Sequence, residues 1–227
     1  MKRIITLFLT LILFYGFSSN ASTTIINNKK HNRETMMKNS LHLVDISMPD
    51  HAVLRKSAEP VLFPLDNKTK EFIETFKTFF AGLKSPYGKP AGLAAPQVGY
   101  SLRIIIIQIP PEAKEKRKDV YDTLPPTVLI NPTYVPIINA GESKDWEGCF
   151  SVPDKMGEVY RYKQIRYEAF KVDGKKITGV AKGFLARLLQ HEIGHLNGEL
   201  YIDCLRPDCR YESIAKAAEI IKQETKN

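Results

Sequence analysis

The stretch Gly183–Gly198, GFLARLLQHEIGHLNG, constrains the fold more than any other part of the chain. Ala186–Gln190 is a run of good helix formers, and Gly198 stands where a left-handed residue would end the helix. His191 and His195 are then one turn apart on the same face. The stretch therefore predicts a helix that presents two imidazoles in one direction.

Glu192 lies between these histidines, so the helix carries the pattern H-E-x-x-H. Two imidazoles at this spacing hold one divalent metal, and the adjacent carboxylate can act as a general base toward water. The alternative is a helix whose histidines only cap it or fill the core. We favour the metal site, because all three side chains are present in the required arrangement.

Cys149 is the candidate for a third metal ligand. A catalytic metal keeps three protein ligands and one open position. The residue lies in Glu147–Pro153, where Gly148 and Pro153 predict a tight loop. A thiolate with two imidazoles suits zinc or ferrous iron. Taken alone, a cysteine here could also be a small buried hydrophobic residue.

A third stretch, Gly92–Gly99, combines small residues with one amide side chain. Small residues let the backbone approach a ligand closely, and Gln97 supplies a donor for a developing oxyanion. On its own, Gly92–Ala95 is equally typical of tight helix or loop packing.

The N-terminal residues are typical of a secretory signal. Lys2 and Arg3 supply positive charge, Ile4–Phe17 is a nearly unbroken apolar run, and Ser19–Ala21 is a small-residue cleavage site. The run is shorter than the roughly 20 residues that span a membrane. We therefore expect a signal peptide over residues 1–21 and no stable membrane insertion after cleavage, with an uncleaved anchor as the alternative.

Residues 22–42 are expected to be a disordered leader, and residues 43–227 a single catalytic domain. The signal predicts an exported protein, periplasmic or secreted, or an organellar one if the leader is bipartite. The net charge is +8, but residues 1–40 contribute +5 of it. The basic charge is thus mostly a property of the N-terminal segment, and we expect no nucleic-acid partner.

Hydrophobic periodicity predicts an amphipathic helix from about Asn67 to Leu83 and a C-terminal helix over Tyr211–Lys222. A charged loop at Pro110–Lys118 is expected to be exposed, and Asp173-Gly174 predicts a hairpin turn. The expected strands are Arg103–Ile109, Thr127–Ile130, Tyr134–Ile138, Glu158–Val172, Lys176–Val180 and Glu199–Leu205. The predicted class is α+β, with antiparallel sheets packed around the central H-E-x-x-H helix. Cys204 and Cys209 would either pair in an oxidising compartment or stay reduced.

Together, the three stretches resemble the three signature motifs of the peptide deformylases, in the family's order and at about its usual spacing. These are Gly92–Gln97, Glu147–Ser151 and Gln190–His195, within a likeness that covers roughly Ile46–Leu205. The resemblance implies removal of the formyl group from N-formyl-methionyl peptides or polypeptide N-termini, with release of formate.

The resemblance also implies a role for each matched residue. Cys149, His191 and His195 would bind one divalent ion, ferrous iron in the usual case, with zinc or nickel as substitutes. Glu192 would take a proton from the attacking water and pass it to the leaving amine. In addition, Gln97 and the backbone N–H of Phe150 would hold the oxyanion. The substrate groove would be lined by the backbone of Gly92 and Leu93, and the methionine pocket by Phe184 and Leu188.

The sequence departs from the family pattern at three positions. Pro90 stands where the first motif usually begins with Gly, and Phe150 where Leu is more usual. Gly194 replaces an Asp, which removes a partner for the ligands and places Gly inside the helix. Two other functions therefore stay open: a weakened deformylase-like protein that only binds metal or formyl-peptides, and an H-E-x-x-H metallopeptidase with Glu199 as third ligand.

Overall fold

The structure, a computed structural model, describes residues 41–85 and 89–224. Leu41–Asn227 form one compact unit. The predicted signal peptide and the leader up to Ser40 lie outside the described residues. The helices are α2 (Asn67–Gly82), α3 (Ala113–Lys116), α4 (Gly183–Leu196) and α5 (Ile214–Glu224), with 3₁₀ turns at His51–Arg55, Ala95–Val98, Ile138–Ala140 and Tyr201–Cys204. The strands are β1 (Gly92–Ala94), β2 (Ile104–Ile109), β3 (Leu124–Pro136), β4 (Glu142–Cys149), β5 (Val152–Tyr162), β6 (Gln164–Phe170), β7 (Lys176–Lys182) and β8 (Tyr211–Ser213).

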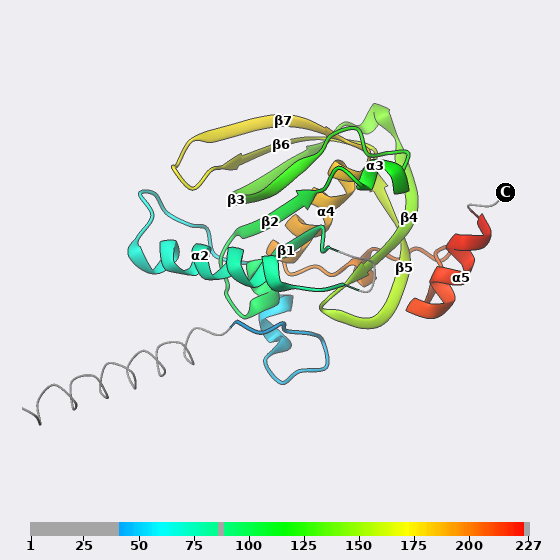
Figure 1. The fold of residues 1–227 in the computed structure, drawn as a ribbon, viewed down its shortest axis with the longest axis horizontal. Coiled ribbons are helices and arrows are strands. Elements are labelled where there is room, and N and C mark those ends of the chain that lie inside the picture. Colours follow the sequence, from blue (N-terminus) through cyan, green and yellow to red (C-terminus); the bar gives the residue numbers. More distant parts are fainter. Residues whose placement is uncertain (1–40, 86–88, 225–227) are drawn as a thin grey trace, which may run out of the picture. The chain divides into compact units, whose positions relative to one another are not determined.

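Within the described residues the strands form two antiparallel sheets, in the orders β1-β2-β3-β6-β7 and β4-β5-β8. Helix α4 lies between them and contacts strands of both, whereas α2 packs on the far face of the five-stranded sheet (Figure 1). The predicted α+β class is therefore confirmed. Among residues 41–85 and 89–224, none of the helices combines the length and the hydrophobicity that a membrane crossing requires.

Strand β2 is isoleucine-rich because it is buried on both faces. Ile105 and Ile107 pack in the core cluster that contains α4, and Ile104 and Ile106 pack in the cluster that contains α2. A short continuous apolar run is the pattern expected of such a strand. Burial on both sides fixes this strand, and with it the neighbouring edge strand β1, beside the metal-motif helix.

Helix α4 follows the sequence pattern closely. It runs over Gly183–Leu196, and Gly198 beyond its end has the left-handed conformation, with φ of +79°. Its apolar side chains, including Leu189 and Ile193, face the five-stranded sheet in the core. The helix is thereby anchored along its length, and the orientation of its histidines is fixed by the same packing.

Several predicted elements are wrong in detail. The predicted strands Thr127–Ile130 and Tyr134–Ile138 are one strand, β3, because Asn131 tolerates a φ of +50° and its side chain hydrogen-bonds both backbone groups of Val61. Glu158–Val172 is divided between β5 and β6, which belong to different sheets.

Two further corrections fall near the C-terminus. The region predicted as strand Glu199–Leu205 contains a 3₁₀ turn at Tyr201–Cys204, where the side chain of Asp203 accepts the N–H of Leu200. The last helix begins at Ile214, because the preceding Tyr211–Ser213 pair with β5 as strand β8. Cys204 and Cys209 are free thiols in the structure, which corresponds to the reduced alternative.

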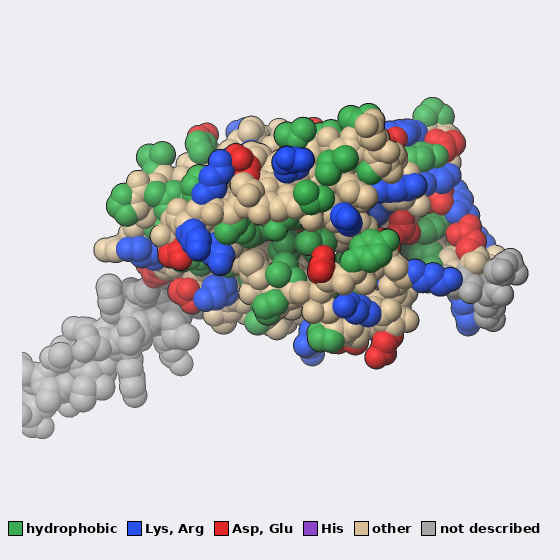
Figure 2. All heavy atoms as spheres, turned by 90° about the horizontal axis from the view of Figure 1, so that it is seen from above, with side chains coloured by type: hydrophobic (Ala, Val, Ile, Leu, Met, Phe, Trp, Pro, Cys, Tyr) green, Lys and Arg blue, Asp and Glu red, His purple; other side chains and the backbone are tan. Residues whose placement is uncertain are grey.

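Basic, acidic and apolar side chains are mixed on the face shown in Figure 2. Among the described residues, exposed charged side chains are often paired: Arg206 with Glu142, Lys176 with Glu168, and Arg210 with Glu224. Exposed pairs of this kind contribute little to stability individually.

Candidate active site

Helix α4 and the end of strand β4 bring three metal-ligating side chains together. Cys149 is the last residue of β4, and His191 and His195 face it from α4. One ligand atom from each of the three lies within 4.8 Å of the other two, and Sγ of Cys149 is 3.2 Å from Nε2 of His195. Among the described residues, these three side chains form a cluster of potential metal ligands that is compact enough to hold one ion.

The donor set fits a divalent transition metal. Tetrahedral coordination with metal–sulfur bonds of about 2.3 Å and metal–nitrogen bonds of about 2.0 Å separates neighbouring ligand atoms by roughly 3.3–3.6 Å. Sγ of Cys149 and Nε2 of His195, 3.2 Å apart, are close to this spacing, and the other pairs of ligand atoms lie within 4.8 Å. Glu199, the third ligand that a metallopeptidase would need, is not part of the cluster.

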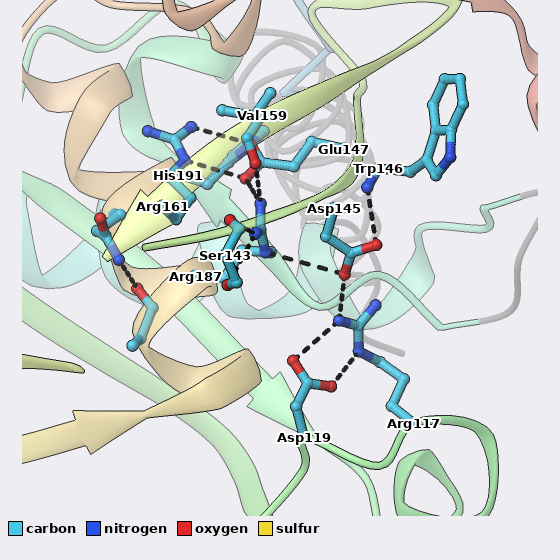
Figure 3. Close-up of polar contacts among 12 residues, drawn as sticks. Arg117, Asp119, Ser143, Asp145, Trp146, Glu147, Val159, Arg161, Arg187 and His191 are labelled. Atoms are coloured by element: carbon cyan, nitrogen blue, oxygen red, sulfur yellow. Dashed lines mark hydrogen bonds and ion pairs between the residues drawn. The ribbon is translucent and has the colours of Figure 1, made fainter. Parts of the chain in front are cut away.

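Glu147 orients the first histidine. Its carboxylate accepts a hydrogen bond of 2.9 Å from Nδ1 of His191, receives both Nε and Nη2 of Arg161, and lies 2.7 Å from Nη1 of Arg187 (Figure 3). Burial opposes ionisation of this group, yet the hydrogen bond from His191 and the charge of Arg161 hold the pKa of Glu147 well below its usual range. With Nδ1 engaged as the donor, Nε2 of His191 is left to bind a metal.

The sequence reasoning assigned no role to Glu147. Its position two residues before Cys149 indicates such a role, because alternate residues of a strand point to the same face. Because Gly148 and Pro153 predict a tight loop over Glu147–Pro153, and no strand is predicted over the residues just before it, the strand periodicity of β4 is not evident from the sequence.

The pKa values of the two histidines are shifted in opposite directions. Burial lowers the pKa of His191, but the Cys149 thiol and Glu147 beside it raise the pKa well above the usual value. Burial and the charge of His191 lower the pKa of His195 well below the usual value for histidine. Nδ1 of His195 is buried and has no hydrogen-bond partner among the described residues. Both imidazoles must be neutral to bind a metal, and the buried Nδ1 of His195 leaves its Nε2 free for this.

Glu192 faces the same site from α4. It is 4% exposed, and its Oε2 has no partner within the part of the chain that the structure describes. Burial raises the pKa of Glu192 to about 7. A carboxylate with a pKa near neutrality is suited to accept and return a proton.

Gln97 is held in one orientation by the backbone of β1. Its Oε1 accepts the N–H of Ala94 at 2.9 Å, which turns Nε2 toward Sγ of Cys149 and Oγ of Ser151, both at 3.3 Å. The hydroxyl of Ser151 in turn donates to the carbonyl of Val44. The amide donor predicted from the sequence therefore points to the metal cluster.

A cavity of about 580 Å³ opens onto these groups. Gly92, Phe150, Phe184 and Leu188 line it, together with Gln97, Cys149, His191 and Glu192. Leu93 does not, because its side chain is fully buried in the core cluster that contains α2. Any contact of Leu93 with a ligand is therefore limited to its backbone.

The three departures from the family pattern are accommodated. Pro90 is buried and its carbonyl accepts the side-chain amide of Gln108. A Cβ on Gly194 would lie 3.8 Å from its nearest neighbour, Glu199, so glycine is not required there for space. Phe150 lines the cavity and packs against the core cluster around α2.

Comparison with known proteins agrees with this geometry. A sequence profile described as "Polypeptide deformylase" matches residues 43–211. Peptide deformylase 2 of Rickettsia conorii is 39% identical, over 74% of this chain and 82% of that protein. The peptide deformylase of Symbiobacterium thermophilum is 37% identical, over 80% of this chain and 78% of that protein.

Solved structures are similar as well. The peptide deformylase of Thermotoga maritima superposes with a TM-score of 0.58 and 32% identity, covering 74% of this chain and 98% of that one. The Synechococcus elongatus enzyme, solved in complex with actinonin, gives a TM-score of 0.59 at 28% identity, covering 82% and 89%. With its Cys149, His191 and His195 cluster, the chain belongs to the peptide deformylase family and is a metal-dependent hydrolase of that kind.

Proposed function

We propose that the protein removes the formyl group from N-formyl-methionyl peptides or polypeptide N-termini and releases formate. The observation that carries this proposal is the buried Glu192, with a pKa near 7, which lines the same cavity as Cys149 and His191 of the metal cluster. Deformylation needs a base that later acts as an acid, and this carboxylate is suited to both steps.

We further propose one ferrous ion per chain, held by Cys149, His191 and His195, with zinc or nickel as substitutes. When bound, the ion polarises the formyl carbonyl and lowers the pKa of water. A thiolate with two imidazoles is compatible with each of these metals. Glu147 supports the site by holding His191 through Nδ1.

The remaining roles fall to the chain's own groups. Glu192 accepts a proton from the attacking water and gives it to the amine that leaves. The oxyanion that forms on the formyl group is stabilised by Nε2 of Gln97 and the backbone N–H of Phe150. Support for the first donor is the hydrogen bond from Ala94, which holds the amide in that orientation before substrate binds.

We place the methionine side chain against Phe184 and Leu188. Both line the cavity next to His191, so an apolar side chain there would lie beside the reacting group. The backbone of Gly92 and Leu93, in the edge strand β1, would then align the peptide. An apolar wall with a few polar groups is typical of a small-ligand site.

We also propose that residues 1–21 are a cleaved signal and that the mature protein is exported, with an organellar destination as the alternative. Support comes from the Ile4–Phe17 apolar run and the Ser19–Ala21 site. N-terminal sequencing of the protein isolated from its native source, after cell fractionation, tests this. A mature chain that starts at Met1 in the compartment of synthesis would overturn it.

The activity test is formate release from a formyl-Met-Ala peptide, with the full chain purified anaerobically and loaded with iron or nickel. We expect release by the wild type and by Glu115→Gln, a matched change of an exposed glutamate on α3. We expect its loss in Glu192→Gln with metal content unchanged. Equal release by Glu192→Gln would refute the assigned base, and no release by metal-loaded wild type would refute the proposed substrate.

A further inference from the structure

The loop between β2 and β3 contributes to the active-site cavity through Arg117. The sequence predicted an exposed loop over Pro110–Lys118, and most of its residues are exposed. Arg117 is different, because its side chain is 29% exposed and lines the cavity. One arginine of a surface loop thus reaches the site where the substrate would bind.

Arg117 is held from three sides. Its Nε and Nη2 lie 2.9 and 3.0 Å from the two oxygens of Asp119, and Nη2 also lies 2.5 Å from Oδ2 of Asp145 (Figure 3). Its guanidinium carbon is 4.7 Å above the centre of the Phe184 ring. A planar guanidinium makes a fork of hydrogen bonds and a stacking contact at once, which a lysine cannot do.

The loop is also fixed to the first turn of α4. The carbonyl of Asp119 accepts the backbone N–H of Phe184 at 3.0 Å. Gly183 has a φ of +55°, and a Cβ there would overlap that same carbonyl. Val120, the next residue of the loop, is buried in the core cluster around α4. The position of Arg117 over Phe184 is therefore set by the backbone as well as by the side chains.

The contacts of Arg117 continue toward the metal cluster. Oδ2 of Asp145 lies 3.9 Å from Nε of Arg187, whose Nη1 lies 2.7 Å from Glu147, the partner of His191. Asp119 and Asp145 balance the charges of Arg117 and Arg187 at this end of the cavity. Arg117 and Arg187, which line the cavity, therefore already have carboxylate partners, so an uncharged side chain can lie against them without competing for their charge.

We propose that Arg117 is a positioning residue that sets selectivity for the first side chain of the substrate by holding the Phe184 ring as a wall of the cavity. The inference rests on the proposed role of Phe184 in binding methionine. Arg117 acts through the ring, so it governs how well the peptide binds and which side chain is accepted, while proton transfer by Glu192 is left intact.

The test compares Arg117→Gln, Phe184→Ala and the double variant in the full, metal-loaded chain, with formyl-Met-Ala and formyl-Ala-Ala peptides. We expect Arg117→Gln to raise KM for the methionyl peptide about three- to tenfold, in line with loss of a cation–π contact. We expect kcat to change less than twofold and the preference for methionine over alanine to fall. Lys118→Gln, an exposed neighbour, is the matched control and should match the wild type.

The double variant distinguishes positioning from an independent effect. If Arg117 acts through the ring, the double variant has the KM of Phe184→Ala alone, because the second change has nothing left to displace. Additive effects, or an unchanged KM in Arg117→Gln, would overturn the proposal. If Phe184→Ala itself leaves KM unchanged, Phe184 does not bind the methionine side chain, and the proposed role of Phe184 is refuted instead. If Arg117→Gln does not fold, Arg117→Lys replaces it in the test, because lysine keeps a positive charge near both aspartates. A wild-type KM in Arg117→Lys would also refute the proposal.

Discussion

The carboxylate of Glu192 occupies the space in which a Cβ of Gly92 would lie. Glycine at this position of β1 is thus a steric requirement of the general base on α4. We predict that Gly92→Ala displaces the carboxylate and lowers kcat about a hundredfold, the order of a lost acid–base contribution. Metal content should stay at the wild-type level, because the ligands are on other segments. Formate release measures kcat, and metal analysis measures the metal content. A wild-type kcat in Gly92→Ala would show that the Glu192 carboxylate can move without loss of its function.

Gly194, unlike Gly92, is predicted to tolerate a Cβ and to be stabilised by it. It lies inside α4, and a Cβ there would have only ordinary contacts, with Glu199 at 3.8 Å. Replacing a helical glycine with alanine reduces the entropy lost on folding, so Gly194→Ala should raise the free energy of unfolding by about 0.5–1 kcal/mol. Urea denaturation of the metal-free protein measures it. A destabilised variant would mean that the turn around Gly194 is tighter than the structure shows.

Glu147→Gln should weaken both the fold and the metal site. The change leaves Arg161 and Arg187 buried without their counter-ion, which costs about 3 kcal/mol or more in unfolding free energy. It also removes the anionic partner of His191, so metal affinity should fall about ten- to a hundredfold. Denaturation and competitive metal titration give the two values. Glu142→Gln, which breaks a more exposed pair with Arg206, should leave metal affinity unchanged.

The raised pKa of Glu192 gives the metal-free protein a specific pH dependence. The folded-state pKa is about 7 and the ordinary value is 4.5, so the folded protein binds the proton more tightly than the unfolded chain does. The contribution of Glu192 to stability is therefore present below pH 4.5 and is lost as the pH rises toward 7. Glu192→Gln should flatten this slope in denaturation curves measured from pH 5 to 8. An identical slope in the variant would place the titrating group elsewhere.

The same group predicts the pH dependence of turnover. A base must be ionised to accept a proton, so kcat/KM should rise with pH and level off once Glu192 is deprotonated. A bound cation stabilises the carboxylate and moves this rise below pH 7. Rate measurements in buffers from pH 4 to 9 locate it. A rate that falls over the acidic range as the pH increases would contradict a base role for this residue.

Two of the three metal ligands could be predicted from local sequence, whereas Cys149, on strand β4, is inferred from ligand chemistry and from the family resemblance. His191, Glu192 and His195 share one helix, and helical spacing alone places them on one face. Glu147 and Arg117 could not be found in this way. Their roles depend on the pairing of β4 with β5 and on the loop between β2 and β3 reaching the start of α4, contacts between segments distant in sequence.

The same limit explains the errors in the fold. The helix at Asn67–Gly82 and the Asp173-Gly174 hairpin were correct because periodicity and turn chemistry specify them. The long alternating run from Glu158 contains no Gly or Pro to mark its division. Its break at Lys163 is set by tertiary contacts: this residue's N–H donates to Gly141 and its carbonyl accepts from Gly183.

That break at Lys163 has a consequence for metal binding. The chain leaves the three-stranded sheet at Tyr162 and enters the five-stranded sheet at Gln164. Cys149 belongs to the first sheet, whereas His191 and His195 belong to a helix packed on the second. An ion held by all three therefore cross-links the end of strand β4 to helix α4, which contacts both sheets, and its binding free energy adds to the cohesion of the fold.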